Sequence, residues 1–263
     1  KPPSKKDGDN GMYRPALRLS ATGVPLLSKA QLERIAQRYI RESLPALTVE
    51  GYRFSAADFA QQYLQLTLQY EWLSNNGCYL GMTTYRDDTI IPVYVPETNT
   101  LKRLRVAKGT ILIDQSMQAE HKRFGEQFTI LHECAHQILH WGYYRQANAL
   151  PCRREVAQPN YLPYTWTDDT RMEWQANYLA SALLLPLPAL NSMLQEHDMQ
   201  GYYQYRISRG LSEYAAFRQA AAEVAFRFHV STIIAKIRLQ NIGFGGNLPI
   251  EYPMDQSLPE QET

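Results

Sequence analysis

The sequence has few cysteines and no long apolar run. Its three cysteines, Cys78, Cys134 and Cys152, are odd in number and show no CxxC spacing. This argues against a disulfide framework and for a reducing compartment. Without a run of about 18 apolar residues, no segment should span a membrane. The polar opening of the chain also lacks the apolar stretch of a signal peptide. We therefore expect a cytoplasmic protein without a membrane partner.

The chain also lacks an excess of charge of either sign. Lys and Arg number 27 against 26 Asp and Glu, which leaves a formal net charge of +1. A protein whose main function is to bind nucleic acid would usually be clearly basic, so direct nucleic-acid binding is not expected. The 263 residues, 44% of them apolar and 20% charged, fit one large or two modest globular domains.

The first half of the chain predicts two helices followed by a small sheet. A capping box at Ser28–Gln31 and apolar residues at helical spacing predict a helix over 29–43, stopped by Pro45. A second, short helix should begin at Ser55. Five short segments rich in β-branched and aromatic residues then follow, at 66–72, 79–85, 90–95, 102–106 and 109–114. They predict a mainly antiparallel sheet with hairpin-sized connections.

From about residue 120 the pattern is helical. The segment around His132 and the segment 168–185 each predict a strong helix, the latter with acids in its first turn and Pro186 after its end. Pro188 can open another helix, and two more should cover 213–228 and 231–240. Residues 141–167, rich in aromatic and turn residues, predict a long loop. A loop of this length inside a compact domain is usually functional.

One motif in the helical half carries chemistry, since residues 132–136 read His-Glu-Cys-Ala-His and match HExxH. Residues four apart lie on one face of a helix, so His132 and His136 can bind the same ion. Glu133 can take a proton from a water that zinc has made acidic. Apolar neighbours on both sides place the motif on a half-buried helix, which favours a metal site over two exposed surface histidines.

A catalytic zinc site needs a third protein ligand, and the extended HExxHxxGxxH motif is absent. The acidic candidates downstream are Glu155, Asp168, Asp169 and Glu173. Glu173 shares a helical stripe with Ala176 and Ala180 and should face inward. An acid on an apolar stripe is rarely left unpaired, so Glu173 is either a ligand or part of a buried salt bridge.

The HExxH motif, together with Glu173-Trp-Gln-Ala-Asn177-Tyr-Leu-Ala180 and Leu183-Leu-Leu-Pro186, resembles the ImmA/IrrE family of metallopeptidases. That family carries an HExxH helix and a later helix of the form E-x-x-A-(N/D)-x-(F/L)-A that ends in Leu-Leu-x-Pro. The resemblance covers roughly residues 28–239.

The resemblance implies the α+β class: a zincin-like peptidase core with a small, mainly antiparallel sheet and an active-site HExxH helix, followed by a helical C-terminal region. It implies a gluzincin-like zinc (Zn²⁺) site with His132, His136 and Glu173 as ligands and Glu133 as general base. It also implies a protein substrate, because family members with known roles cleave helix-turn-helix transcriptional repressors.

The sequence departs from the family pattern in two places. Cys134-Ala135 stand where Leu-Gly is commoner, and we interpret Cys134 as a small buried residue, not a ligand. The interval between His136 and Glu173 is also long, and its aromatic insertion can form one wall of a substrate cleft.

The residue that stabilises the oxyanion is left open by the sequence. His140 lies on the same side of the helix as His136. It can contact substrate or the oxyanion, or it can support the helix end and a ligand. Four tyrosines of the long connection are further candidate donors: Tyr143, Tyr144, Tyr161 and Tyr164.

Residues 221–243 resemble a helix-turn-helix, with His229-Val230-Ser231 as the turn and Ser231 capping the second helix. DNA contact by Lys236 and Arg238 would suit a regulatory or sensor protein with an inert or structural metal site. The weak net charge favours a helical pair packed on the peptidase core, and the intact Glu133 favours an enzyme. The predicted organisation is a flexible leader (1–27), a metallopeptidase domain (28–197), a helical region (198–250) and a tail (251–263).

Overall fold

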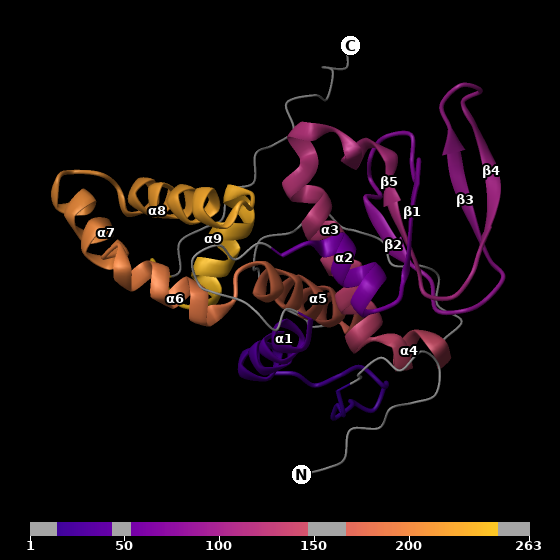
Figure 1. Ribbon diagram of the computed structural model, residues 1–263, viewed down its shortest axis with the longest axis horizontal. Helices are drawn as coiled ribbons and strands as arrows, with labels where there is room; N and C mark the ends of the chain where they lie inside the picture. The colour runs from indigo at the N-terminus through magenta and orange to yellow at the C-terminus, as the bar shows by residue number, and fades with distance from the viewer. Residues whose placement is uncertain (1–14, 44–53, 147–166, 247–263) are drawn as a thin grey trace.

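The structure is a computed structural model that describes residues 15–43, 54–146 and 167–246. Figure 1 shows the strands on one side, helices α3 and α5 in the middle, and helices α6 to α9 on the other side. The main hydrophobic core lies around the central helices and joins residues of α1, α3, α5, α8 and α9. The predicted α+β class with a helical C-terminal region is confirmed.

The segment before the first helix is buried at Val24 and Pro25. Leu19 and Pro25 form a β-bridge, and Val24 between them is completely buried. The stretch predicted as a flexible leader (1–27) therefore includes a buried contact at its end. The apolar Val24 is covered by Tyr144 and Met172.

The two N-terminal helices begin where their caps predicted. α1 spans Lys29–Ser43, and the backbone N–H groups of Ser28 and Gln31 donate to each other's side chains at 2.8 and 3.3 Å. α2 spans Ala56–Asp58 and continues as a π-helical turn, Phe59–Tyr63. Its start is capped by Ser55, whose hydroxyl accepts from the Asp58 N–H at 3.2 Å. Local capping thus sets both helix starts.

The strands form a three-stranded sheet and a separate two-stranded ribbon. The sheet contains β1 (Thr67–Glu71), β2 (Gly81–Thr83) and β5 (Thr110–Asp114) in the order β1-β5-β2. The ribbon contains β3 (Thr89–Val95) and β4 (Thr100–Val106). Two of the pairings, β2–β5 and β3–β4, are antiparallel as predicted, whereas β1 pairs with β5 in parallel. The ribbon packs on the sheet through a small core of its own.

The position of β5 in the middle of the sheet accounts for its pairing with β1 and for its burial. β5 returns to the sheet between β1 and β2, with the ribbon over one face and α3 in contact with the other. Every residue of β5 is buried. A strand covered on both faces is largely apolar, as the run Ile111-Leu112-Ile113 in the middle of β5 shows.

Three helices follow β5 and its 3₁₀ turns (Gln115–Gln118 and Glu120–Lys122): α3 (Arg123–Leu139), α4 (Trp141–Gln146) and α5 (Asp168–Leu184). α3 is buried on all sides from Phe128 to Leu139, more deeply than the predicted half-buried helix. The prediction of a loop from residue 141 is wrong at its start. Helical hydrogen bonding resumes with the Tyr144 N–H donating to His140 O at 3.1 Å, and Tyr144 stacks on Tyr85.

The C-terminal region consists of α6 (Leu187–Glu196), α7 (Met199–Ser208), α8 (Glu213–Phe228) and α9 (Thr232–Asn241). His229 ends α8 in the left-handed conformation, and the Ser231 hydroxyl caps α9 by accepting from the Ile234 N–H at 3.3 Å, as predicted. α7 was not singled out by the sequence. It starts at Asp198, whose carboxylate accepts from the Gly201 N–H.

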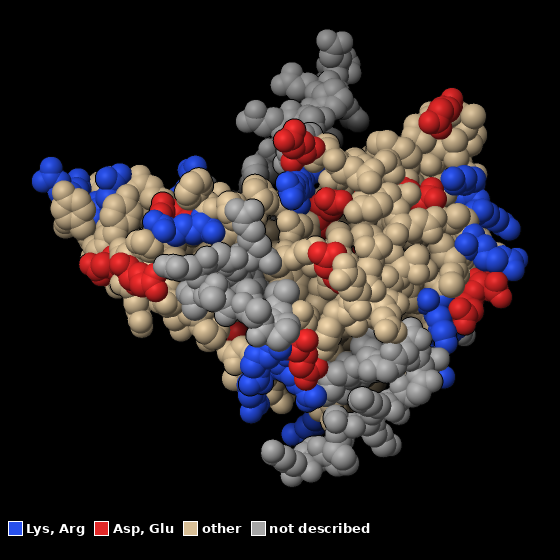
Figure 2. Space-filling view, in the orientation of Figure 1, with Lys and Arg blue, Asp and Glu red and all other residues tan. Residues whose placement is uncertain are grey.

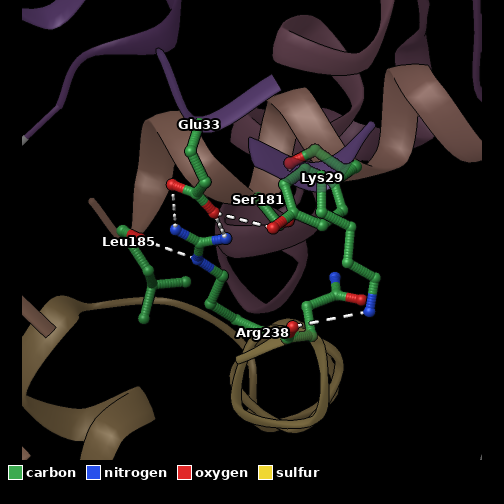
Figure 3. A network of polar contacts seen from close by, with 7 residues as sticks. Lys29, Glu33, Ser181, Leu185 and Arg238 are labelled. Carbon is green, nitrogen blue, oxygen red and sulfur yellow. Dashed lines mark hydrogen bonds and ion pairs between the residues drawn. The ribbon is translucent and has the colours of Figure 1, made fainter. Parts of the chain in front are cut away.

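The alternative in which Lys236 and Arg238 contact DNA is wrong for these two residues. Arg238 is completely buried and Lys236 is 7% exposed. Figure 3 shows the Arg238 guanidinium reaching from α9 to the Glu33 carboxylate on α1 and to the backbone oxygen of Leu185 at the end of α5. On the face shown in Figure 2, basic and acidic side chains lie side by side along the ribbon, where Lys102 pairs with Glu71 and Arg105 with Asp88.

Among the described residues, no helix combines the length and the apolar character needed to cross a bilayer. The cellular location inferred from the cysteines stays a prediction, as do the domain boundaries.

Candidate metal centre

The two histidines of the HExxH motif and Glu173 converge on one point between α3 and α5. The Nε2 atoms of His132 and His136 are 3.0 Å apart. Each Nε2 atom also lies 3.3 Å from one carboxylate oxygen of Glu173, Oε2 for His132 and Oε1 for His136. The centre thus combines a helical i, i+4 pair with one carboxylate supplied by the packing of α5 against α3.

These separations fit a tetrahedral zinc ion. Zn–N and Zn–O bonds are about 2.0–2.2 Å long, so two ligand atoms of a tetrahedral site lie about 3.3 to 3.5 Å apart. The observed distances of 3.0 and 3.3 Å are close to this spacing. Two imidazoles and one carboxylate also match the donor set of a catalytic zinc site, in which three protein ligands leave one position open. The residues present therefore fit the ion that the sequence implied.

Burial and charge act on the pKa values of the metal-facing groups. Burial lowers the pKa of the His136 imidazole, although the nearby Glu173 carboxylate acts in the opposite direction. Burial on its own raises the pKa of Glu173. Interactions with His136 and His132 outweigh this effect and hold the carboxyl pKa well below its usual range. Neutral imidazoles and an ionised carboxylate are the forms that bind a cation.

The three metal-facing side chains differ in their exposure to solvent. The side chains of His132 and His136 are 6% and 0% exposed, whereas that of Glu173 is 26% exposed. Of the three metal-facing side chains, that of Glu173 is therefore the most exposed to solvent.

Glu133 lies beside the two histidines on α3 and is 1% exposed. Its carboxylate is directed toward β2, where a Cβ atom added to Gly81 would stand 3.1 Å from Glu133 Oε1 and 2.6 Å from Thr129 Cγ2. Gly81 therefore lets the strand approach α3 closely enough to enclose this carboxylate. The neighbouring Cys134 is completely buried, and burial raises the pKa of its thiol, which agrees with the predicted role as a small core residue.

Both metal-facing histidines are held from behind by hydrogen bonds. His132 Nδ1 lies 2.9 Å from Asn177 Oδ1. His136 Nδ1 lies 3.0 Å from His140 Nδ1, and His140 Nε2 lies 2.9 Å from Gln175 Oε1. His140 is completely buried with both ring nitrogens engaged. Of the two roles considered for His140, the structure favours support of His136 over contact with substrate.

The other candidates are placed less closely. Asp168 and Asp169 lie in the first turn of α5 and are outside the group of converging donor atoms. Tyr144 is buried, with its ring centroid 6.2 Å from that of His136. Tyr161, Tyr164 and Glu155 lie outside the described residues, so their predicted roles stay predictions.

Asn177, Gln175 and Gly81 were not predicted to have a role at the site. Asn177 could have been found, since it lies four residues after Glu173 and so on the same face of α5. No signal in the sequence marks Gln175 or Gly81, because their partners are distant in the chain.

The site combines a helix with two histidines and a glutamate, a further glutamate from the next long helix, and a small sheet. These are features of metal-dependent hydrolases of the peptidase type. The comparison with protein families agrees with this class. Residues 89–240, more than half of the chain, match the peptidase family M78, described as the IrrE N-terminal-like domain. The chain belongs to this family. No curated protein matches the chain.

Proposed function

We propose that this protein is a zinc-dependent endopeptidase that cleaves a specific regulatory protein, a helix-turn-helix transcriptional repressor or a protein like it. The observation that carries the proposal is the convergence of His132, His136 and Glu173 within ligand distance of one another. Glu133 follows His132 directly on the same helix. In this arrangement the three residues hold the ion and Glu133 handles protons.

Bound zinc would supply Lewis acidity and make a nearby water acidic enough to attack a peptide carbonyl at neutral pH. The chain's own groups perform the proton transfers. The Glu133 carboxylate accepts a proton from the attacking water and later delivers it to the nitrogen of the leaving amine. One O–C bond forms and one C–N bond breaks, and Glu133 ends the cycle in its starting form. Burial of Glu133 keeps bulk water from competing for that proton.

The proposed substrate is supported by family relationships and not by the geometry of the site. Membership of a peptidase family favours a protein substrate. The helix-turn-helix repressor comes from the resemblance to the ImmA/IrrE family described above. A DNA-binding role of the chain itself receives no support from Lys236 and Arg238, which are buried.

The test of the hydrolytic mechanism is Glu133→Gln, which removes the proton acceptor and keeps the shape of the side chain. We expect cleavage to fall by about 10²–10⁴-fold, a typical contribution of general acid–base catalysis. Zinc content, measured by elemental analysis, should remain near that of the wild type. The matched control is Glu126→Gln on the same helix, where Gln can still accept from the Tyr70 hydroxyl. If Glu133→Gln cleaves as fast as Glu126→Gln, the mechanism is wrong.

The substrate is tested with the same pair of proteins. A cell extract is incubated with wild-type protein and, separately, with Glu133→Gln, and newly formed protein N-termini are identified by mass spectrometry. We expect a small set of cleavage sites in the wild-type sample, located in a helix-turn-helix regulator. Sites confined to proteins of other classes would refute the repressor while leaving the peptidase in place.

A further inference from the structure

A chain of buried hydrogen bonds connects the N-terminal segment to the metal centre. The Gln175 side-chain Nε2 donates to the backbone oxygen of Pro25 at 2.7 Å. Gln175 Oε1 lies 2.9 Å from His140 Nε2, and His140 Nδ1 lies 3.0 Å from His136 Nδ1. Gln175, His140 and His136 are each completely buried, so water does not compete for these bonds.

The backbone oxygen of Pro25 fixes the donor and the acceptor in every hydrogen bond of this series. A backbone carbonyl can only accept, so the Gln175 amide must present its NH₂ group to Pro25 and its oxygen to His140. The His140 Nε2 atom must then carry the proton. A neutral imidazole has a single N–H, so His140 Nδ1 is left as an acceptor. The proton between His140 and His136 therefore resides on His136 Nδ1.

The consequence concerns His136, the last residue in this series of hydrogen bonds. With its proton on Nδ1, a neutral His136 presents an unprotonated Nε2 toward His132 Nε2 and the Glu173 carboxylate. This is the tautomer that can donate an electron pair to a metal, and the hydrogen bond at the other ring nitrogen generally selects it. His132 reaches the same state separately, through Asn177.

We propose that Pro25, Gln175 and His140 form a relay that sets the tautomer and orientation of the ligand His136. Gln175 and His140 are its positioning residues, and the segment around Pro25 is part of the metal centre. This inference rests on the proposed metal site but not on peptidase activity. It assigns a function to the segment around Pro25, although this segment is far from the HExxH motif in sequence.

The first experiment uses wild-type protein without metal. Two-bond ¹H–¹⁵N correlation spectra of the imidazole rings distinguish Nδ1–H from Nε2–H tautomers. Resonances are assigned by comparison with His136→Gln and His140→Gln. We expect a proton on His136 Nδ1 and His140 to be predominantly the neutral Nε2–H tautomer, whether or not His136 Nε2 also binds a proton beside Glu173 in the absence of metal. A predominant Nε2–H form of His136 would overturn the proposal, whether or not the protein later proves to be a peptidase.

The second experiment breaks the relay with Gln175→Met, which keeps the length of the side chain and removes both polar groups. We expect zinc affinity, measured by competition with a chromogenic chelator, to fall by about 10–100-fold. Removal of a residue that hydrogen-bonds a metal ligand typically has an effect of this size. The Nδ1–H population of His136 should fall with it. The control is Leu179→Met, a volume-conserving change at a fully buried position of the same helix. It should change neither quantity.

The outcomes separate the relay from simple packing. If Gln175→Met lowers zinc affinity while the tautomer of His136 is unchanged, Gln175 acts only through packing and the proposal is wrong. It is equally wrong if Gln175→Met matches Leu179→Met in both measurements. If the wild type binds no zinc, the proposed function fails. The tautomer measurements on metal-free protein then still decide the relay.

Discussion

Two carboxylates, Glu173 and Glu33, lie in polar clusters toward opposite ends of α5, and their surroundings differ in kind. The Glu33 side chain is 11% exposed and meets a positive charge supplied by the chain itself, the guanidinium of Arg238, with Tyr178 as a further donor at 2.8 Å. The Glu173 side chain is 26% exposed and meets two imidazole nitrogens. These nitrogens are electron-pair donors in their neutral form.

The difference shows how a structural carboxylate is distinguished from a functional one. At Glu33 the charges balance within the protein, and the cluster joins α1, α5 and α9. At Glu173 three donor groups lie within ligand distance of one another, and the Glu173 side chain is partly exposed, which suits binding of an external cation. Both residues are largely buried acids, and only their partners distinguish the structural carboxylate from the functional one.

The largest expected effect comes from exchanging each carboxylate for its amide. Glu173→Gln removes a charged ligand and should therefore lower zinc affinity by more than roughly 100-fold. That figure is the upper end of the effect of removing a residue that only hydrogen-bonds a ligand. Glu33→Gln should leave zinc affinity unchanged. Both are measured by chelator competition on purified protein. Equal zinc affinities in the two variants would show that the comparison is mistaken and that the third ligand lies elsewhere, with Glu155 the next candidate.

The next effect concerns stability at the other end of α5. Arg238→Met removes the partner of a buried carboxylate and should lower the free energy of unfolding by about 3–5 kcal/mol. Adding Glu33→Gln removes the uncompensated charge, so the double variant should regain a large part of that loss. Urea denaturation of the metal-free protein measures both. No recovery in the double variant would mean that the guanidinium acts through its bond to Leu185 O and not through Glu33.

A third prediction tests the close approach of β2 to α3. Gly81→Ala would place a Cβ atom 2.6 Å from Thr129 Cγ2, so strand and helix must move apart and Glu133 must shift. We expect a loss of about 1–3 kcal/mol in unfolding free energy, the usual cost of overpacking, together with slower cleavage. Adding Thr129→Ser deletes the clashing methyl group and keeps the hydroxyl that donates to Gly125 O. The double variant should recover part of both losses, and an unchanged defect would point to a cause other than this contact.

The smallest expected effects compare two helix caps. Thr167→Ala at α5 and Ser231→Ala at α9 each remove a side chain that accepts from a backbone N–H, at 3.1 and 3.3 Å. Each should lower the unfolding free energy by about 1 kcal/mol, followed by thermal denaturation. Only Thr167→Ala lies on the helix of Glu173, so only this variant should also weaken zinc binding. A change of zinc affinity in Ser231→Ala would show that α9 is coupled to the metal centre.

Several features follow from the sequence because they depend on neighbouring residues. The caps at Ser28, Ser55 and Ser231 and the start of α5 lie where the residue pattern predicts them. A cap needs only a side chain and a backbone N–H two or three residues away. The spacing of four in HExxH likewise places two histidines on one face of any helix. The inward position of Glu173 follows from the helical stripe that it shares with alanines.

Tertiary structure alone decided how these local pieces meet. It brought Glu173, which the family resemblance already implied as a ligand, to within 3.3 Å of both Nε2 atoms. It also joined Gln175 to Pro25, 150 residues apart, and Arg238 to Glu33, 205 residues apart. In the sequence Gln175 looks like an ordinary polar helix residue and Arg238 like a basic residue that could contact DNA, and the parallel pairing of β1 with β5 leaves no local pattern. Such contacts depend on the packing of whole elements, whereas periodicity and capping depend on the covalent neighbourhood, and only the latter can be predicted from the order of residues.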